Sequence, residues 1–233
     1  MSMNEQSKRI QTSILNSLEK KVLIWLAERQ PKWMTSDILT YIGSLGAVVI
    51  AIGYILSIIN INYLWLSSLG FIINWYGDSL DGTLARVRKA QRPIYGYYLD
   101  HTVDAINEVI IFVGIGLSGL MHLEFALLAL VAYFMITINV SINAHLKKEF
   151  KLTYAGMGPT EFRLIMIIIN TIFIYSEHIR EFIIHIKFFD RQLSLASMDI
   201  VAIAMTIILF AIYFHDIIHD AKGYAEIDPL KKQ

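Results

Sequence analysis

Four aspartates near the middle of the chain have the spacing that most clearly points to chemistry. Asp78 and Asp81 are three residues apart, and Asp100 and Asp104 are four apart. Each pair therefore shares one face if it lies on a helix. A carboxylate at the centre of a membrane-spanning helix costs on the order of 3 kcal/mol to insert. Such groups need a partner or a water-filled cavity, so we expect the four aspartates to gather in one polar site.

Divalent cations would neutralise such a site. Lys and Arg residues are too few on these faces to do so, since only Arg86 shares the face of Asp78. Two ions of charge +2 would balance four carboxylates, and oxygen ligands in a chain without cysteine favour Mg²⁺ or Mn²⁺ over zinc. Paired metal ions suit phosphoryl chemistry, because they neutralise charge on the leaving group. The alternative is that the aspartates lie solvated in loops.

Gly82 and Arg86 extend the pattern along the same predicted helix. Glycine costs a helix about 1 kcal/mol relative to alanine, but it lets a ligand approach the backbone closely. Arg86 lies two turns after Asp78 and can donate a forked pair of hydrogen bonds to a phosphate. For Gly82 alone, helix–helix packing is the alternative explanation.

Read together, these residues form one continuous pattern. It runs Asp78-Ser-Leu-Asp81-Gly82-Thr-Leu-Ala85-Arg86 and, nine residues later, Gly96-Tyr-Tyr-Leu-Asp100-His-Thr-Val-Asp104. This pattern resembles the complete signature of the CDP-alcohol phosphotransferase family, with every fixed position present. The resemblance implies an enzyme that moves a phosphate-linked group from a CDP-activated donor to an alcohol and releases CMP.

The resemblance also implies roles for individual residues. Those implied to bind metal are Asp78, Asp81, Asp100 and Asp104. Asp104 would also be the general base that takes the proton of the acceptor hydroxyl, and Gly82 and Arg86 would hold the CDP group. Asp37 and Thr40 match a segment that lies near the cytidine in the family, although Ser36 replaces the usual proline. The alternative for Asp37 is a helix cap.

The acceptor is less clearly indicated. The family transfers either a phosphatidyl group from CDP-diacylglycerol to a polar alcohol, or a phospho-alcohol from CDP-choline or CDP-ethanolamine to diacylglycerol. Lys147, Lys148 and Arg163 are candidates to bind an acceptor phosphate, and Glu161 lies beside them. For the lysines, ordinary positive charge in a cytoplasmic loop is the alternative. Both transfer directions therefore stay open. We expect a homodimer.

Long apolar segments must position this site. The chain has 233 residues, of which 55% are hydrophobic, and no net formal charge. We predict an all-α integral membrane protein with an amphipathic surface helix in residues 1–34, a six-helix transmembrane domain over 35–222 and a cytoplasmic tail over 223–233. A helix packed on the protein is the alternative for the first segment. The six predicted spans are Asp37–Ile59, Tyr63–Arg86, Gly96–Leu120, Glu124–Leu146, Thr160–His178 and Leu195–His219.

The distribution of basic residues predicts the orientation. Lys and Arg gather in the N-terminal segment, the second and fourth loops and the C-terminal tail, so these should face the cytoplasm together with the site. The charged segment from Met1 to Trp33 is not typical of a signal peptide. No basic tract of the kind that binds nucleic acid is present. Two rival functions are a cation transporter or channel that uses the aspartates, and an inactive scaffold with the same fold.

Overall fold

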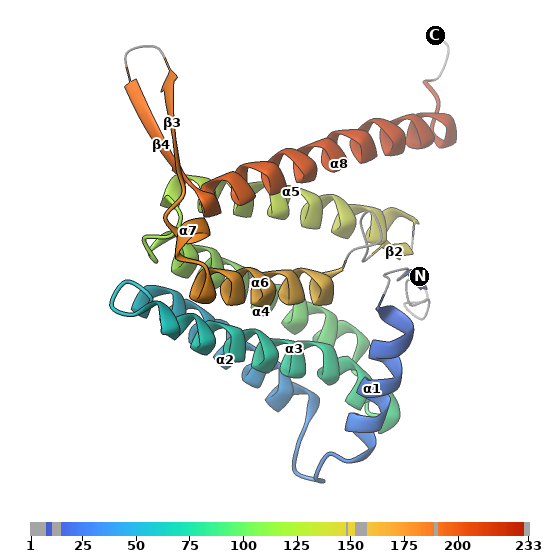
Figure 1. The fold of residues 1–233 in the computed structure, drawn as a ribbon. Coiled ribbons are helices and arrows are strands. Elements are labelled where there is room, and N and C mark those ends of the chain that lie inside the picture. The colour runs from blue at the N-terminus through green and yellow to red at the C-terminus, as the bar shows by residue number, and fades with distance from the viewer. Residues whose placement is uncertain (1–7, 11–14, 148, 152–157, 189–190, 231–233) are drawn as a thin grey trace.

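The computed structural model describes residues 8–10, 15–147, 149–151, 158–188 and 191–230, and most of them are helical (Figure 1). The helices are α1 (Asn16–Glu28), α2 (Ser36–Leu56), α3 (Leu64–Val87), α4 (Pro93–Gly116), α5 (Leu123–Lys147), α6 (Pro159–Tyr175), α7 (Glu177–Arg180) and α8 (Ser197–Ile227), with a short 3-10 turn, η1 (Ile61–Tyr63), before α3. The strands are β1 (Lys8–Ile10), β2 (Glu149–Lys151), β3 (Ile183–Phe188) and β4 (Arg191–Ala196).

The six predicted spans correspond to α2, α3, α4, α5, α6 and α8. Within the described residues, three helices are long and apolar enough to cross a membrane: α2, α5 over Leu123–Leu146, and α8. Helices α3 and α4 have 24 residues each, but they carry the aspartates of the signature. These charges interrupt the apolar runs of α3 and α4, and α6 has only 17 residues, so length and hydropathy single out the other three helices.

The prediction of an all-α fold needs one correction. Strands β3 and β4 form an antiparallel hairpin, and β1 pairs with β2 in parallel. In Figure 1 the hairpin projects from the end of the molecule opposite α1. Isoleucines alternate with polar residues over Ile184, His185, Ile186 and Lys187, which is a period of two and favours a strand. The alternation covers only a few residues, so the all-α prediction did not include this hairpin.

Helices α2 and α3 are held close together by small residues. A methyl group built on Gly77 would lie 2.2 Å from the backbone nitrogen of Gly43, and one on Gly46 would lie 2.4 Å from the backbone nitrogen of Asn74. On another side of α2, a methyl group on Gly114 of α4 would lie 2.5 Å from Ala51. Close backbone approach of this kind is common between membrane helices. It fixes α3 and α4, the two helices of the signature, against the same partner.

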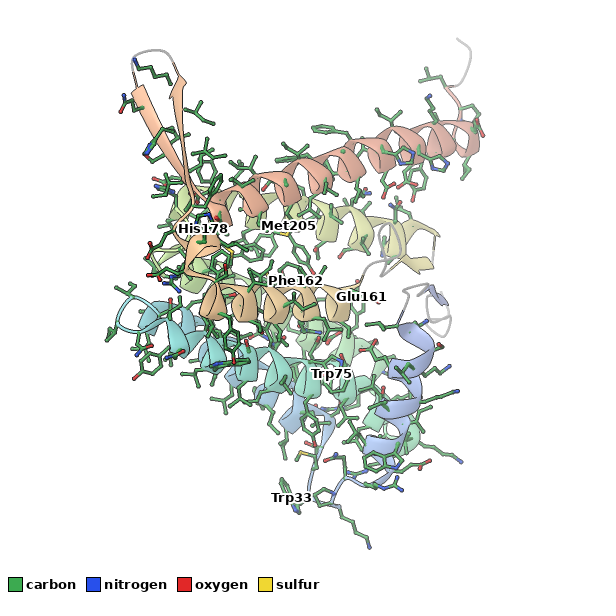
Figure 2. The ribbon with its side chains drawn as sticks, in the orientation of Figure 1. Trp33, Trp75, Glu161, Phe162, His178 and Met205 are labelled. Carbon is green, nitrogen blue, oxygen red and sulfur yellow. The ribbon has the colours of Figure 1, made fainter. Side chains whose placement is uncertain are left out.

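Apolar side chains from six helices, including Ala126 of α5, fill the space between them. The main cluster combines residues of α2, α3, α4, α5, α6 and α8, among them Tyr54, Phe71, Ile111, Met166 and Met198. A second cluster joins α1 to α2 and α3 and includes Leu23, Ala27, Leu39, Leu80 and Leu84. Figure 2 shows Phe162 and Met205 between α6 and α8, and it places Glu161 and His178 at opposite ends of α6.

Helix α1 is packed against the bundle by its inner face. Its Glu19 is buried, and the carboxylate accepts hydrogen bonds from Trp75 Nε1 at 2.8 Å and Thr160 Oγ1 at 2.6 Å. On the outer face, Leu18 and Trp25 are exposed. The helix is therefore docked on α3 and α6, as the alternative for this segment predicts, and it carries apolar side chains on its outer face.

Candidate metal and substrate site

Three of the four aspartates, one on α3 and two on α4, bring their carboxylates together. Carboxylate oxygens of Asp78, Asp100 and Asp104 all lie within 4.8 Å of one another, and each side chain is half-buried. The spacing explains the arrangement, since Asp100 and Asp104 stand one turn apart on α4 and face Asp78 on α3. Like charges this close repel strongly unless a cation lies between them or they take up protons.

Asp81 is placed differently. It is buried beside α2, where its Oδ2 accepts a hydrogen bond from Thr40 Oγ1 at 2.7 Å. Ser36 Oγ donates to the backbone carbonyl of Asp81 at 2.9 Å, and the backbone N–H of Gly82 donates to the Asp81 carboxylate. Thr40, predicted to lie near the cytidine of the donor, thus attaches the start of α2 to Asp81 together with Ser36. Asp81 lies outside the group of three mutually close carboxylates.

A cation from α6 completes the cluster. Arg163 donates from Nη2 to Asp78 Oδ2 and from Nε to Asn74 Oδ1, the latter at 2.9 Å. Its Nη1 is buried and has no hydrogen-bond partner among the described residues. Among the cations on the helices of the signature, only Arg86 shares the face of Asp78 in the sequence. Arg163 was predicted to bind an acceptor phosphate, but its ion pair with Asp78 was not, because the two residues are 85 positions apart in the chain.

Arg86 and Asp37 are more exposed than Asp78. Arg86 is exposed at the end of α3 and donates from Nη2 to Thr83 Oγ1 at 2.9 Å. Asp37 pairs with Arg92 in the connection before α4, and the hydrogen bonds from Arg92 raise the pKa of its guanidinium. The capping alternative for Asp37 is wrong, because the hydroxyl of Thr35 caps α2 by accepting from the Ile38 N–H at 3.2 Å.

The proposed acceptor residues separate into two groups. Arg163 lies in the cluster, whereas Glu161 is buried at the start of α6, with both carboxylate oxygens on backbone amides. These oxygens accept from the Gly158 N–H at 2.9 Å and from the Leu15 N–H at 3.1 Å. Glu161 therefore caps α6 and holds the start of α1. Lys147 ends α5, and its side chain lies outside the described part of the chain, as does all of Lys148.

Two residues near the cluster were missed in the sequence. Glu108 stands one turn after Asp104 on α4, with Tyr133 of α5 near its carboxylate. Its spacing from Asp100 and Asp104 repeats the helical interval of four, which was a usable signal. Asn74 stands one turn before Asp78, but an isolated asparagine in an apolar segment gave no such signal.

The donor set fits a hard divalent cation. The three convergent groups offer only oxygen atoms, as Mg²⁺ and Mn²⁺ prefer. Their three formal negative charges exceed the single positive charge of Arg163. The excess supports cation binding, and an empty cluster would retain strong repulsion.

Comparison with known proteins identifies the family of the chain. Residues 33–212 match the model of the CDP-alcohol phosphatidyltransferase family, and the chain belongs to that family. One similar protein is the phosphatidylinositol phosphate synthase of Cutibacterium acnes, 33% identical over 84 residues, which are 36% of this chain and 38% of that protein. Another is the archaetidylinositol phosphate synthase of Methanothermobacter thermautotrophicus, 33% identical over 104 residues, 45% of this chain and 50% of that one. The matched regions thus span half or less of these relatives.

Proposed function

We propose that this chain is an integral membrane enzyme that transfers a phosphatidyl-type group from a CDP-linked lipid to the hydroxyl of a polar alcohol. The observation that carries the proposal is the convergence of Asp78, Asp100 and Asp104 within the intact signature of a family member. A transporter or channel would need acidic residues at several depths of the membrane. The cluster instead lies at one end of α3, close to Gly82 and Arg86.

The proposed chemistry assigns a role to each aspartate of the signature. Asp104 takes the proton of the acceptor hydroxyl, whose oxygen forms a bond to the phosphorus that carries the lipid. The bond from that phosphorus to the CMP oxygen breaks, and CMP leaves. Asp78, Asp81, Asp100 and Asp104 would hold two Mg²⁺ or Mn²⁺ ions, which neutralise charge on the departing phosphate when bound. The chain has no cysteine nucleophile, which supports direct displacement.

Donor and acceptor occupy different sides of this arrangement in the proposal. Gly82 lets the CDP group approach α3, and Arg86 donates to its phosphates, with Asp37 and Thr40 near the cytidine. Arg163 faces the acceptor, since its Nη1 is a buried donor with no partner in the described structure. A phosphate on the acceptor would satisfy that donor, as charge-assisted hydrogen bonds to phosphate are strong.

The acceptor we favour is a phosphorylated polyol. Both relatives are named as synthases of inositol phosphate lipids. This supports a CDP-linked lipid as donor over CDP-choline or CDP-ethanolamine. We further propose six spans, with the site and both termini on the cytoplasmic side, because basic residues concentrate there.

The test is CMP release by purified protein in detergent. CDP-diacylglycerol would be paired in turn with inositol phosphate, glycerol phosphate, inositol and serine, and CDP-ethanolamine with diacylglycerol. We expect CMP release with a phosphorylated polyol, its loss in EDTA, and recovery with Mg²⁺ or Mn²⁺. Full activity in a stringently metal-free preparation would refute the metal assignment. CMP release only from CDP-ethanolamine would refute the proposed direction of transfer.

A further inference from the structure

Asn74 connects three helices at the level of the carboxylate cluster. It lies on α3, is 4% exposed, and donates from Nδ2 to the backbone carbonyl of Gly43 on α2 at 2.9 Å. Its Oδ1 accepts from Arg163 Nε on α6 at 2.9 Å. The donor and the acceptor group of the Asn74 amide therefore both make hydrogen bonds, and the bond to α2 fixes the orientation of the amide.

The fixed amide determines where Arg163 points. Asn74 and Asp78 stand one turn apart on α3 and hold the Nε and Nη2 atoms of the same guanidinium. Because the guanidinium is planar and rigid, holding these two nitrogens also fixes the direction of the third. That third nitrogen, Nη1, is buried and lacks a hydrogen-bond partner among the described residues. A buried unsatisfied donor is costly, which points to a ligand atom as its partner.

We propose that Asn74 is a positioning residue that aims Nη1 of Arg163 at the phosphate of the acceptor and so sets the preference for phosphorylated alcohols. This inference rests on the proposed function, because it concerns the acceptor of that reaction. Asp78 alone would hold Arg163 by a single pair of atoms and allow the guanidinium to rotate about it. Asn74 removes that freedom without adding charge to the cluster.

Asn170 offers a matched control. It lies on α6, is 1% exposed, and also links the same three helices. It accepts from the Tyr54 hydroxyl of α2 at 2.7 Å and donates to Ser68 Oγ of α3 at 3.2 Å. Asn74→Ala and Asn170→Ala therefore remove comparable buried contacts, but only Asn74→Ala releases Arg163.

The experiment compares KM values for inositol phosphate and inositol in the wild type and both variants. With Asn74→Ala we expect the KM for the phosphorylated acceptor to rise about tenfold or more, the effect of one charge-assisted hydrogen bond. The donor KM and the KM for inositol should change little, so the preference for the phosphate falls. Asn170→Ala should lower the thermal stability and keep the preference. In an Arg163→Gln background, Asn74→Ala should have no further effect on the preference, because its partner is already gone.

These results distinguish the proposed function of the chain from the positioning role of Asn74. A wild type that releases no CMP with any acceptor refutes the proposed function. An active wild type whose preference survives Asn74→Ala, or falls equally in Asn170→Ala, refutes the positioning role and leaves the function standing. If Asn74→Ala does not elute as a folded species, Asn74→Ser replaces it, since its shorter hydroxyl also withdraws the carbonyl from Arg163. Stabilisation of the folded protein by inositol phosphate gives a second readout, which should be weaker in the Asn74 variant.

Discussion

Substituting Gly77 by alanine would test how far the site depends on the close contact of α2 and α3. A methyl group there would lie 2.2 Å from Gly43 N, 2.4 Å from Leu39 O and 2.5 Å from Gly43 Cα. Ordinary contacts between such atoms are about 3.5 Å, so the two helices must separate by on the order of 1 Å. All three atoms belong to the backbone, and no side-chain rotation can relieve the overlap.

The expected change in the free energy of unfolding of Gly77→Ala combines two opposing effects. Overpacking of this kind costs typically about 1–3 kcal/mol, and sometimes more. Alanine regains up to about 1 kcal/mol of helix propensity relative to glycine. The net result should be a clear loss of thermal stability in detergent. Activity should fall further, because Asp78 follows Gly77 directly, and a shift of about 1 Å in a reacting geometry can reduce rates about 100-fold.

Gly223→Ala is the matched control. Gly223 lies on α8, and a methyl group there meets no atom within 4 Å. This substitution should leave activity unchanged and keep or slightly raise the melting temperature, because only helix propensity changes. Melting curves and CMP release would be measured side by side. Equal stability and turnover in the two variants would show that α2 and α3 do not need this close contact.

Three other predictions concern the proposed reaction and its orientation. Asp104→Asn should reduce turnover about 10²–10⁴-fold at saturating Mg²⁺ while CDP binding persists, because the proton acceptor is lost; near-normal turnover would assign the base elsewhere. Arg86→Ala should raise the KM for the CDP donor and hardly change that for the acceptor, as kinetics with each substrate varied would reveal; an effect on the acceptor alone would place Arg86 on the other side of the site. A cysteine introduced at Lys89 should react with impermeant maleimide only in opened cells, and one at Lys187 also in intact cells; the reverse labelling would invert the topology.

The elements of the fold were predictable because their signals are local. Every predicted span overlaps a helix, since long apolar segments and short polar connections can be recognised within a window of about 20 residues. The signature predicted that all four aspartates gather, and Asp78, Asp100 and Asp104 do converge, whereas Asp81 is buried beside α2. The strands β3 and β4 were missed, since a few alternating residues are a weak signal next to a spanning helix.

The partners of the charged residues could not be predicted from the sequence. Arg163 and Asp78 are 85 positions apart, and Glu161 and Leu15 are 146 apart. No periodicity links such residues, because their contact depends on how whole helices pack. Glu161 illustrates the consequence. Its place beside Arg163 in the sequence favoured a shared role, but the two neighbours differ by about 200° around α6 and so face different partners.

The contacts between helices indicate how the site keeps its geometry in an apolar environment. Thr40 ties α2 to Asp81, Glu19 ties α1 to both α3 and α6, and Arg163 ties α6 to Asp78. Removing one partner from a buried charged pair is strongly destabilising, because the remaining charge is left uncompensated. Each helix therefore docks favourably only when its polar groups meet the intended partners. Apolar packing brings the helices together, and these polar contacts select the arrangement in which the carboxylates converge.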